Sequence, residues 1–249
     1  MRLVIAKDYE DMSARVARIV AGQIFLKPNS VLGLATGSTP LMMYQKLIKI
    51  HQQEGLDFTE VVTFNLDEYI GVQPSNVQSY HYYMYHNFFN HVNIQKKNIF
   101  IPNGMTDNVE IECQNYDKRI LEYGGADLQI LGIGNNGHIG FNEPDVKFEV
   151  STHKVKLDDE TLHANSRFFD CLEEVPRFAI SMGIKNIMHA KKVILLANGE
   201  NKADVIYRAF FQGITPEVPA SILQMHEDVT LIIDEKAAQM IKELPTGQQ

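Results

Sequence analysis

Hydrophobic positions follow two patterns along the chain, short continuous runs and longer stretches with helical spacing. The short runs are typical of buried strands and lie at residues 3–6, 30–35, 61–66, 128–133, 192–197 and 229–233. The intervening stretches predict helices at residues 9–25, 40–51, 108–123, 202–211 and from 235 onwards, with an aromatic-rich helical segment at 78–91. Strands that alternate with helices predict an α/β fold: an open, mostly parallel, Rossmann-like sheet with helices on both faces.

Residues 145–190 interrupt this alternation because their pattern is mixed and polar. We expect them to form a lid-like excursion over the sheet. The sequence contains no internal repeat, low-complexity run or obvious linker. A length of 249 residues therefore favours a single α/β domain that spans residues 1–249.

Composition and charge narrow the classes of function. The net charge of −8 argues against broad binding of nucleic acid or of anionic membranes, although a few local cations suffice for a phosphorylated small molecule. The two cysteines, Cys113 and Cys171, have no metal-ligand spacing and suggest neither a disulfide framework nor a metal site. The N-terminal residues lack a secretory signal and no apolar run has membrane-spanning length, so we expect a cytoplasmic protein.

The segment ADLQILGIGNNGHIGFNEP, residues 126–144, carries the strongest chemical signal. Its buried strand runs into a glycine-rich turn with Asn136, His138 and Glu143, and ligands of open α/β sheets bind beyond the carboxyl ends of strands. His138 could exchange a proton near neutral pH, while Glu143 orients it and Asn136 hydrogen-bonds it. A single histidine is more often structural, but the carboxylate and amide in the same turn favour a catalytic role.

The same turn also contains the pattern of a dinucleotide-binding site. Gly132, Gly134 and Gly137 spell GxGxxG, which binds a pyrophosphate where it opens a helix in the first βαβ unit. Here the pattern lies mid-chain, and the following HIGFNEP is a poor start for a helix. The context therefore argues against a nicotinamide dehydrogenase.

Two other strand ends carry polar loops. Gly37, Ser38 and Thr39 precede Pro40, and their hydroxyls and backbone N–H groups could bind an anion, although Ser38 or Thr39 could equally cap the next helix. Asp67 follows the strand at 61–66 and is a candidate general base, or else a cap of the next element. Its neighbour Glu68 should face the other way.

Two cations are candidate phosphate ligands. Lys202 lies in the first turn of a predicted helix, where basic residues are uncommon unless an anion is bound there. Arg167 lies in a locally apolar patch, and its guanidinium suits a bidentate contact with phosphate. Each of them, taken alone, is more often a solvated surface cation.

Taken together, the blocks LGLATGSTP, VTFNLDEYIG, SYHYYM, LGIGNNGHIGFNEP and ANSRFFD resemble the glucosamine-6-phosphate deaminase family. The resemblance implies an enzyme of amino-sugar and N-acetylglucosamine catabolism that converts glucosamine 6-phosphate and water to fructose 6-phosphate and ammonia without a cofactor. It implies that His138, assisted by Glu143 and Asn136, opens the sugar ring, and that Asp67 moves a proton from C2 to C1. The implied phosphate ligands are Gly37, Ser38, Thr39, Arg167 and Lys202.

Two features depart from the family pattern. Many relatives carry Asp where this chain has Asn136, so here the side chain can only orient His138 and cannot take up a proton. Regulated hexameric relatives have a longer C-terminal extension and basic residues after FNEP, which 146–156 match poorly. We therefore expect no activation by N-acetylglucosamine 6-phosphate, and a monomer or small homo-oligomer rather than a hexamer.

Two other functions fit parts of the sequence. A hydrolase similar to 6-phosphogluconolactonase would bind a related sugar phosphate, but it needs no carboxylate that abstracts a C2 proton. A sugar-phosphate-sensing module, as in some transcriptional regulators, would need a DNA-binding element. The sequence shows no basic helix-turn-helix pattern, and its charge is unsuited to DNA.

Overall fold

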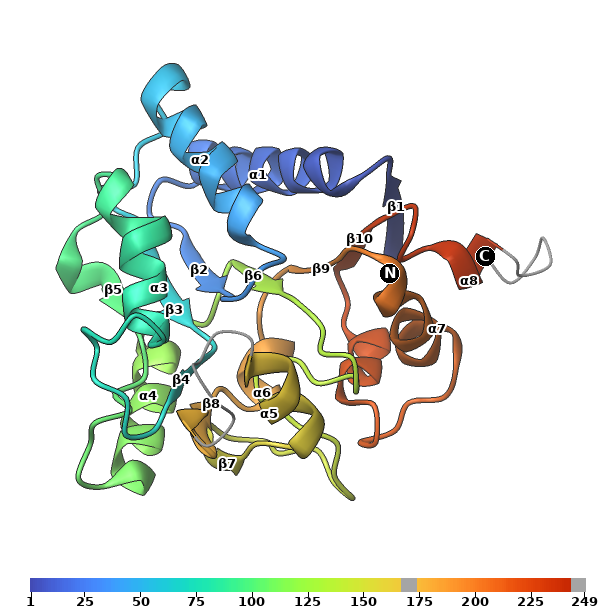
Figure 1. Cartoon of the computed structure of the whole chain (residues 1–249). Helices are drawn as coiled ribbons and strands as arrows, with labels where there is room; N and C mark the ends of the chain where they lie inside the picture. Colours follow the sequence, from blue (N-terminus) through green and yellow to red (C-terminus); the bar gives the residue numbers. More distant parts are fainter. Residues whose placement is uncertain (167–173, 243–249) are drawn as a thin grey trace.

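A computed structural model describes residues 1–166 and 174–242. Its centre is a seven-stranded sheet in the order β1-β10-β9-β6-β2-β3-β5, and every neighbouring pair is parallel (Figure 1). The strands of this main sheet are β1 (Arg2–Ala6), β2 (Val31–Leu34), β3 (Val62–Asn65), β5 (Ile99–Phe100), β6 (Leu128–Leu131), β9 (Val193–Ala197) and β10 (Val229–Asp234). The expected α/β architecture is thus confirmed.

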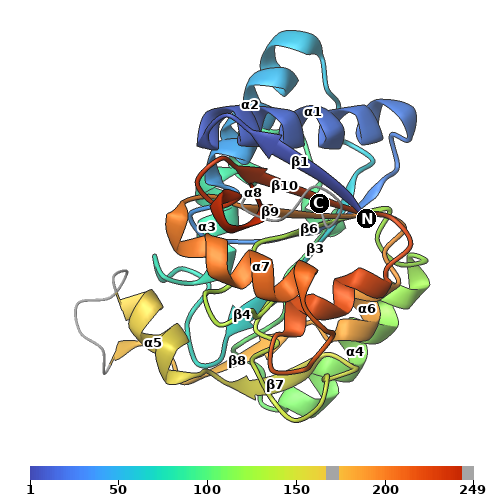
Figure 2. The ribbon, with the colours of Figure 1, turned by 90° about the vertical axis from the view of Figure 1, so that its right-hand side faces the viewer.

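Helices cover both faces of the main sheet, as Figure 2 shows from the side. One face packs against α1 (Tyr9–Leu26), α2 (Leu41–Glu54) and α3 (Tyr80–Asn87), with Val16, Tyr44 and Met84 fully buried among them. The other face packs against α4 (Val109–Glu122), α6 (Ile184–Met188), α7 (Ala203–Phe211) and α8 (Gln239–Lys242). Both layers are apolar because each strand between them is buried on its two sides.

The described parts of residues 145–190 contain more regular structure than their polar pattern suggested. Within them, β7 (His153–Lys156) and β8 (Phe178–Ser181) join β4 (Asp67–Tyr69) in an antiparallel sheet of order β4-β8-β7. Hydrophobic contacts of Tyr69, Phe141 and Leu157 support this second sheet. The helix α5 (Asp159–Ser166) follows β7 and borders the cavity described below.

The sequence reading missed β4, β5, β7 and β8, and it placed several boundaries a few residues away. These four strands have two to four residues each, too short for an alternating pattern to stand out. The closing helix begins at Gln239 rather than at Glu235, because turns precede it. Short 3-10 segments lie at Phe89–His91, Lys96–Asn98, Glu200–Lys202 and Pro219–Met225.

Candidate active site

A cavity of about 630 Å³ lies where β2, β3, β6 and β9 end, at the carboxyl edge of the main sheet. The predicted site residues that line it are Gly37, Ser38, Thr39, Asp67, Asn136, His138 and Lys202. Glu143 contacts His138 from behind the cavity wall, and Arg167 lies outside the described residues. The fold therefore gathers side chains from four separate strand ends into one site.

The turn after β6 requires glycine at two positions. A Cβ atom on Gly134 would lie 2.4 to 2.6 Å from three atoms of the His138 ring, so the imidazole lies directly against the backbone there. Gly137 has a φ of +96°, in the region that favours glycine. No helix occurs in residues 132–152, so the GxGxxG pattern lacks the helix that a dinucleotide-binding fingerprint requires.

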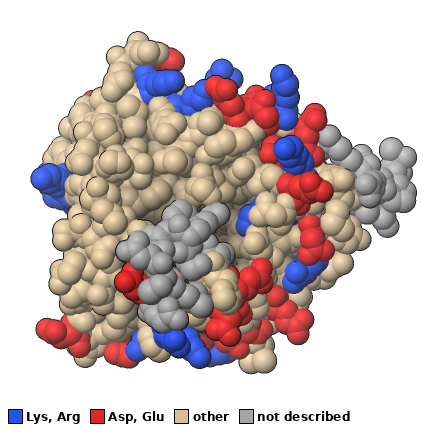
Figure 3. Space-filling view, in the orientation of Figure 1, with Lys and Arg blue, Asp and Glu red and all other residues tan. Residues whose placement is uncertain are grey.

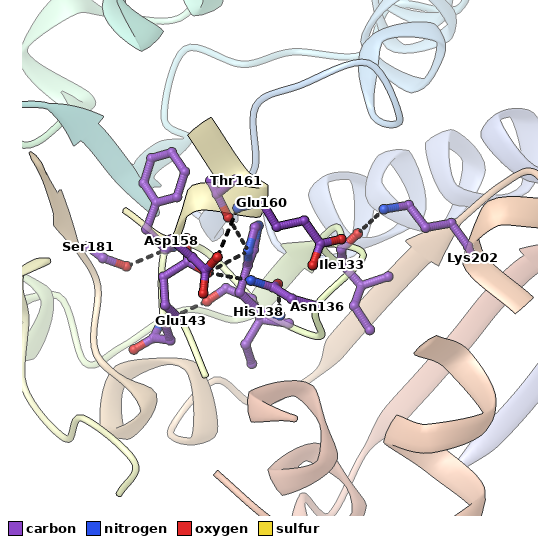
Figure 4. Close-up of polar contacts among 12 residues, drawn as sticks. Ile133, Asn136, His138, Glu143, Asp158, Glu160, Thr161, Ser181 and Lys202 are labelled. Carbon is purple, nitrogen blue, oxygen red and sulfur yellow. Dashed lines mark hydrogen bonds and ion pairs between the residues drawn. The ribbon is translucent and has the colours of Figure 1, made fainter. Parts of the chain in front are cut away.

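His138 and Glu143 form a close pair (Figure 4). His138 Nδ1 lies 3.1 Å from Glu143 Oε2, and 3.4 Å from the hydroxyl of Thr161 on α5. Burial raises the pKa of Glu143, but the hydrogen bond and charge of His138, with hydrogen bonds from Thr161 and Asn136, outweigh it and lower the pKa overall. An ionised Glu143 fixes the imidazole through Nδ1 and leaves Nε2 for proton exchange.

Asn136 contacts the carboxylate rather than the imidazole. Its amide nitrogen donates to Glu143 Oε2 at 2.7 Å, and its oxygen accepts the backbone N–H of His138 at 3.2 Å. The predicted hydrogen bond between Asn136 and His138 is present, but it is made to the backbone N–H of His138 and not to its imidazole. Asn136 instead orients Glu143, which in turn orients the His138 ring.

Asp67 is the buried carboxylate of the cavity. Its side chain is 5% exposed, and it is paired across β4 and β8 with Ser181. Burial, followed by the charge of Glu68, raises the pKa of Asp67 to about 8. The alternative that Asp67 caps the next helix is wrong, because Ser79 caps α3. A carboxylate with such a pKa can both accept and return a proton near neutral pH.

The loop after β2 has its backbone fixed by two tyrosines. The hydroxyl of Tyr9 donates to Ser38 O at 2.8 Å, and that of Tyr83 donates to Gly37 O at 2.6 Å. The helix α2 has Pro40 as its N-cap and no side-chain capping bond, so neither Ser38 nor Thr39 caps it. Both hydroxyls therefore border the cavity beside the N-terminus of a helix, which favours an anion.

Lys202 reaches the same cavity from the N-terminus of α7 (Figure 4). Its Nζ donates to Ile133 O at 2.8 Å and to Asn135 Oδ1 at 2.6 Å, in the loop after β6. These contacts hold a positive charge in the same cavity as the loop after β2. The predicted cation is thus a cavity residue and not a solvated surface lysine.

The sequence reading missed several residues of the cavity wall. Tyr80 comes from α3, and Glu160, Thr161 and His163 come from α5. Tyr80 lies in the SYHYYM block, but a tyrosine among aromatic neighbours gives no sign that it faces a ligand. The α5 residues could not be placed because the position of residues 145–190 depends on the second sheet.

Three further observations concern the described part of the chain. In residues 1–166 and 174–242, no group of three or more His, Cys, Asp and Glu side chains could hold a metal ion. No helix in that part of the chain combines the length and the apolar character needed to cross a membrane. On the face that Figure 3 shows, the described Lys and Arg side chains are dispersed among Asp and Glu.

Comparisons with known proteins show which chains are similar to this one. A family model described as glucosamine-6-phosphate isomerases/6-phosphogluconolactonase matches residues 7–232. The glucosamine-6-phosphate deaminase of Clostridium acetobutylicum is 58% identical over 241 residues, which cover 97% of this chain and 100% of the relative. The corresponding protein of Clostridium botulinum (strain Langeland) is 57% identical over 242 residues, 97% of this chain and 99% of the relative.

Two of the similar solved structures differ widely in their sequence identity to this chain. The structure of a monomeric glucosamine-6-phosphate deaminase is 44% identical with a TM-score of 0.95, over 96% of this chain and 100% of that one. A 6-phosphogluconolactonase from Trypanosoma brucei reaches a TM-score of 0.75 at 18% identity, over 96% of this chain and 97% of that one. The second likeness shows a shared fold alone.

Proposed function

We propose that this chain, which belongs to the family of glucosamine-6-phosphate isomerases and 6-phosphogluconolactonases, converts glucosamine 6-phosphate and water to fructose 6-phosphate and ammonia. One observation carries the proposal: the buried carboxylate of Asp67 and the His138–Glu143 pair share one cavity with an anion-binding loop. A sugar phosphate held at that loop would present its reacting carbons to both sets of groups.

The first step is opening of the pyranose ring. His138 takes the proton of the anomeric hydroxyl and delivers a proton to the ring oxygen, which gives the open-chain aldehyde. Glu143 supports the proposal because it holds the imidazole through Nδ1 at 3.1 Å and stabilises its charged form. Asn136 keeps the Glu143 carboxylate in place through its 2.7 Å hydrogen bond.

The second step is isomerisation. Asp67 removes the proton from C2 of the open-chain sugar, which gives an enolamine, and returns the proton at C1. Water then adds at C2, the C–N bond breaks, and ammonia leaves with the ketose phosphate as the other product. The sequence of steps transfers no electrons to an external acceptor and so needs no redox cofactor. The pKa of about 8 supports this role because Asp67 must hold the proton between its two transfers.

The 6-phosphate binds at the opposite side of the cavity. The Gly37 backbone and the hydroxyls of Ser38 and Thr39 accept it at the N-terminus of α2, and Lys202 supplies a positive charge. We also assign Arg167 to the phosphate from the resemblance of its ANSRFFD block, although it lies outside the described residues.

We further propose that the active form is a monomer or a small homo-oligomer in the cytoplasm. The 44% identical solved relative is a monomeric deaminase, and residues 146–156 match the family's activator-binding pattern poorly. Saturation with glucosamine 6-phosphate should then be hyperbolic and insensitive to low concentrations of N-acetylglucosamine 6-phosphate. A sigmoidal curve that this compound makes hyperbolic, or a hexamer in light scattering, would contradict this assignment.

The deciding experiment is ammonia release from glucosamine 6-phosphate by the purified chain. We expect stoichiometric ammonia and fructose 6-phosphate, with Asp67→Asn as the inactive control. In parallel, 6-phosphogluconolactone should be hydrolysed no faster than in buffer. Lactone hydrolysis without ammonia release would favour the lactonase instead.

A further inference from the structure

Glu68 is a buried carboxylate next to Asp67 that points away from the cavity. It is 3% exposed, and its Oε1 accepts the N–H groups of Tyr69 and Tyr80, each at 2.9 Å. Its Oε2 accepts the N–H of His81 at 2.8 Å. One side chain of β4 thus holds the first two N–H groups of α3, which are free at the start of any helix.

The contacts of Glu68 favour its ionised form. Both carboxylate oxygens face N–H donors, which leaves no acceptor for a carboxylic acid proton in these three contacts. The N-terminus of α3 adds a partial positive charge. Burial raises the pKa of Glu68 overall, and the three hydrogen bonds, which favour the charged form, offset part of that rise. We therefore take Glu68 as a negative charge held next to Asp67.

The helix end that Glu68 holds also carries a wall of the cavity. Tyr80, the first residue of α3, lines the cavity and packs against Tyr69 and Phe141, with ring centroids 4.9 and 5.8 Å away. Loss of the Glu68 contacts would leave the ring of Tyr80 held by Tyr69 and Phe141, but would remove the bonds that fix the backbone of this helix end to β4. Glu68 therefore contributes both to the position of Tyr80 and to the charge beside Asp67.

We propose that Glu68 is a positioning residue, which fixes Tyr80 in the cavity wall and supplies the negative charge that lets Asp67 keep its proton until it is returned. The inference rests on the proposed function, because it assumes that Asp67 is the base. Glu68 touches neither the cavity nor the reacting atoms. It acts through Asp67 and Tyr80.

Among the described groups, Glu68 is the one whose charge raises the pKa of Asp67; the carboxylates of Glu143, paired with His138, and of Glu160 on α5 do not contribute. Tyr80 of α3 and Tyr116 of α4 are phenols whose pKa is raised above its usual value by burial, so both stay neutral near pH 8. Ser181 of β8 does not titrate. His138 and Lys202 line the same cavity and, when charged, would favour the ionised form of Asp67.

The test compares kcat/KM against pH for ammonia release by the full chain and three variants. Glu68→Gln removes the charge and should move the acid limb to lower pH by on the order of one pH unit. Glu68→Asp keeps the charge but is one methylene shorter, so the limb should stay while kcat falls. Ser79→Ala removes the neighbouring cap, a 2.9 Å bond to Tyr82 N, without changing charge, and should leave the limb in place.

Each outcome decides a part of the inference. The titrations of the substrate are common to all four proteins, so they cancel in the comparison. If the acid limb of the Glu68→Gln pH profile coincides with that of the unchanged chain, the electrostatic part of the inference is overturned. A Glu68→Asp variant with unchanged kcat would overturn the positional part, and it serves alone if Glu68→Gln does not fold. No ammonia from the unchanged chain would instead overturn the proposed function.

Discussion

Two aspartates at opposite ends of the main sheet are almost equally inaccessible to solvent, but their pKa values are shifted in opposite directions. Asp67 follows β3 at the carboxyl edge and is 5% exposed, whereas Asp127 precedes β6 at the amino edge and is 4% exposed. Asp127 binds Lys27 Nζ at 2.6 Å, Lys191 Nζ at 2.8 Å and Val31 N at 2.8 Å. For Asp67, the described residues provide no ion-pair partner.

The partners decide what burial does to each carboxylate. Burial raises the pKa of Asp127, but the hydrogen bonds from Lys191, Lys27 and Val31 reverse the shift and lower it. At Asp67 none of the described residues opposes the effect of burial, and Glu68 adds to it, so the pKa rises to about 8. A buried carboxylate with cations is fixed in one charge state, and one without them can exchange a proton near neutral pH.

The largest effect that we predict from comparing the two aspartates is a loss of activity. Asp67→Asn should lower ammonia release and solvent-deuterium exchange at C2 by about 10²–10⁴-fold or more, because the general base is lost while binding persists. Asp127→Asn, the same change at the other end of the sheet, should retain activity in the folded protein. Near-normal deuterium exchange in Asp67→Asn would remove this residue from the mechanism.

The second prediction compares two lysines, Lys202 at the carboxyl edge of the main sheet and Lys191 at its amino edge. Lys202→Ala should raise KM for glucosamine 6-phosphate about 10- to 100-fold, because a charge-assisted contact with phosphate is worth roughly 1.5–3 kcal/mol. The matched variant Lys191→Ala loses its 2.8 Å contact with Asp127 and should leave KM unchanged. Turnover of unphosphorylated glucosamine should be equally slow with and without Lys202. Glucosamine turned over as well as its phosphate would refute the phosphate assignment.

The same contrast shows which features the sequence could reveal. Long strands and helices were predicted because burial on both sheet faces produces continuous apolar runs and helical spacing. The loops of the site were found because glycine, hydroxyl, carboxylate and imidazole groups follow strands whose carboxyl ends meet at one edge. The local sequence pattern was therefore sufficient to identify candidate site residues that lie within a few residues of a strand end.

Contacts between distant segments left no local signal. The sequence correctly predicted that Glu68 faces away from Asp67. Its contacts with Tyr80 and His81 could not be predicted, because they depend on how α3 folds back on β4. The bond from Asn136 to Glu143 was not predicted, because the path of the turn decides whether the amide meets the imidazole or the carboxylate. The ion pairs of Asp127 could not be predicted from the sequence, because its two lysine partners come from distant parts of the chain.

The smallest expected effect is on stability, where the two aspartates should show opposite pH dependence. The lowered pKa of Asp127 gives stability that is present above its unfolded pKa of about 3.8 and lost as pH falls through the folded pKa. Asp127→Asn should therefore lower the free energy of unfolding by about 1–3 kcal/mol at neutral pH, and by less in acid.

The stability that Asp67 contributes has the opposite pH dependence. Its folded pKa is raised, so the stability given by its protonated form is present below about pH 3.8 and is lost as pH rises towards about 8. Asp67→Asn keeps a neutral side chain at every pH, so its free energy of unfolding should increasingly exceed that of the unchanged chain between those values. Thermal or urea unfolding across this range checks both slopes. Parallel profiles for the two variants would mean that their different partners do not set the charge of these carboxylates.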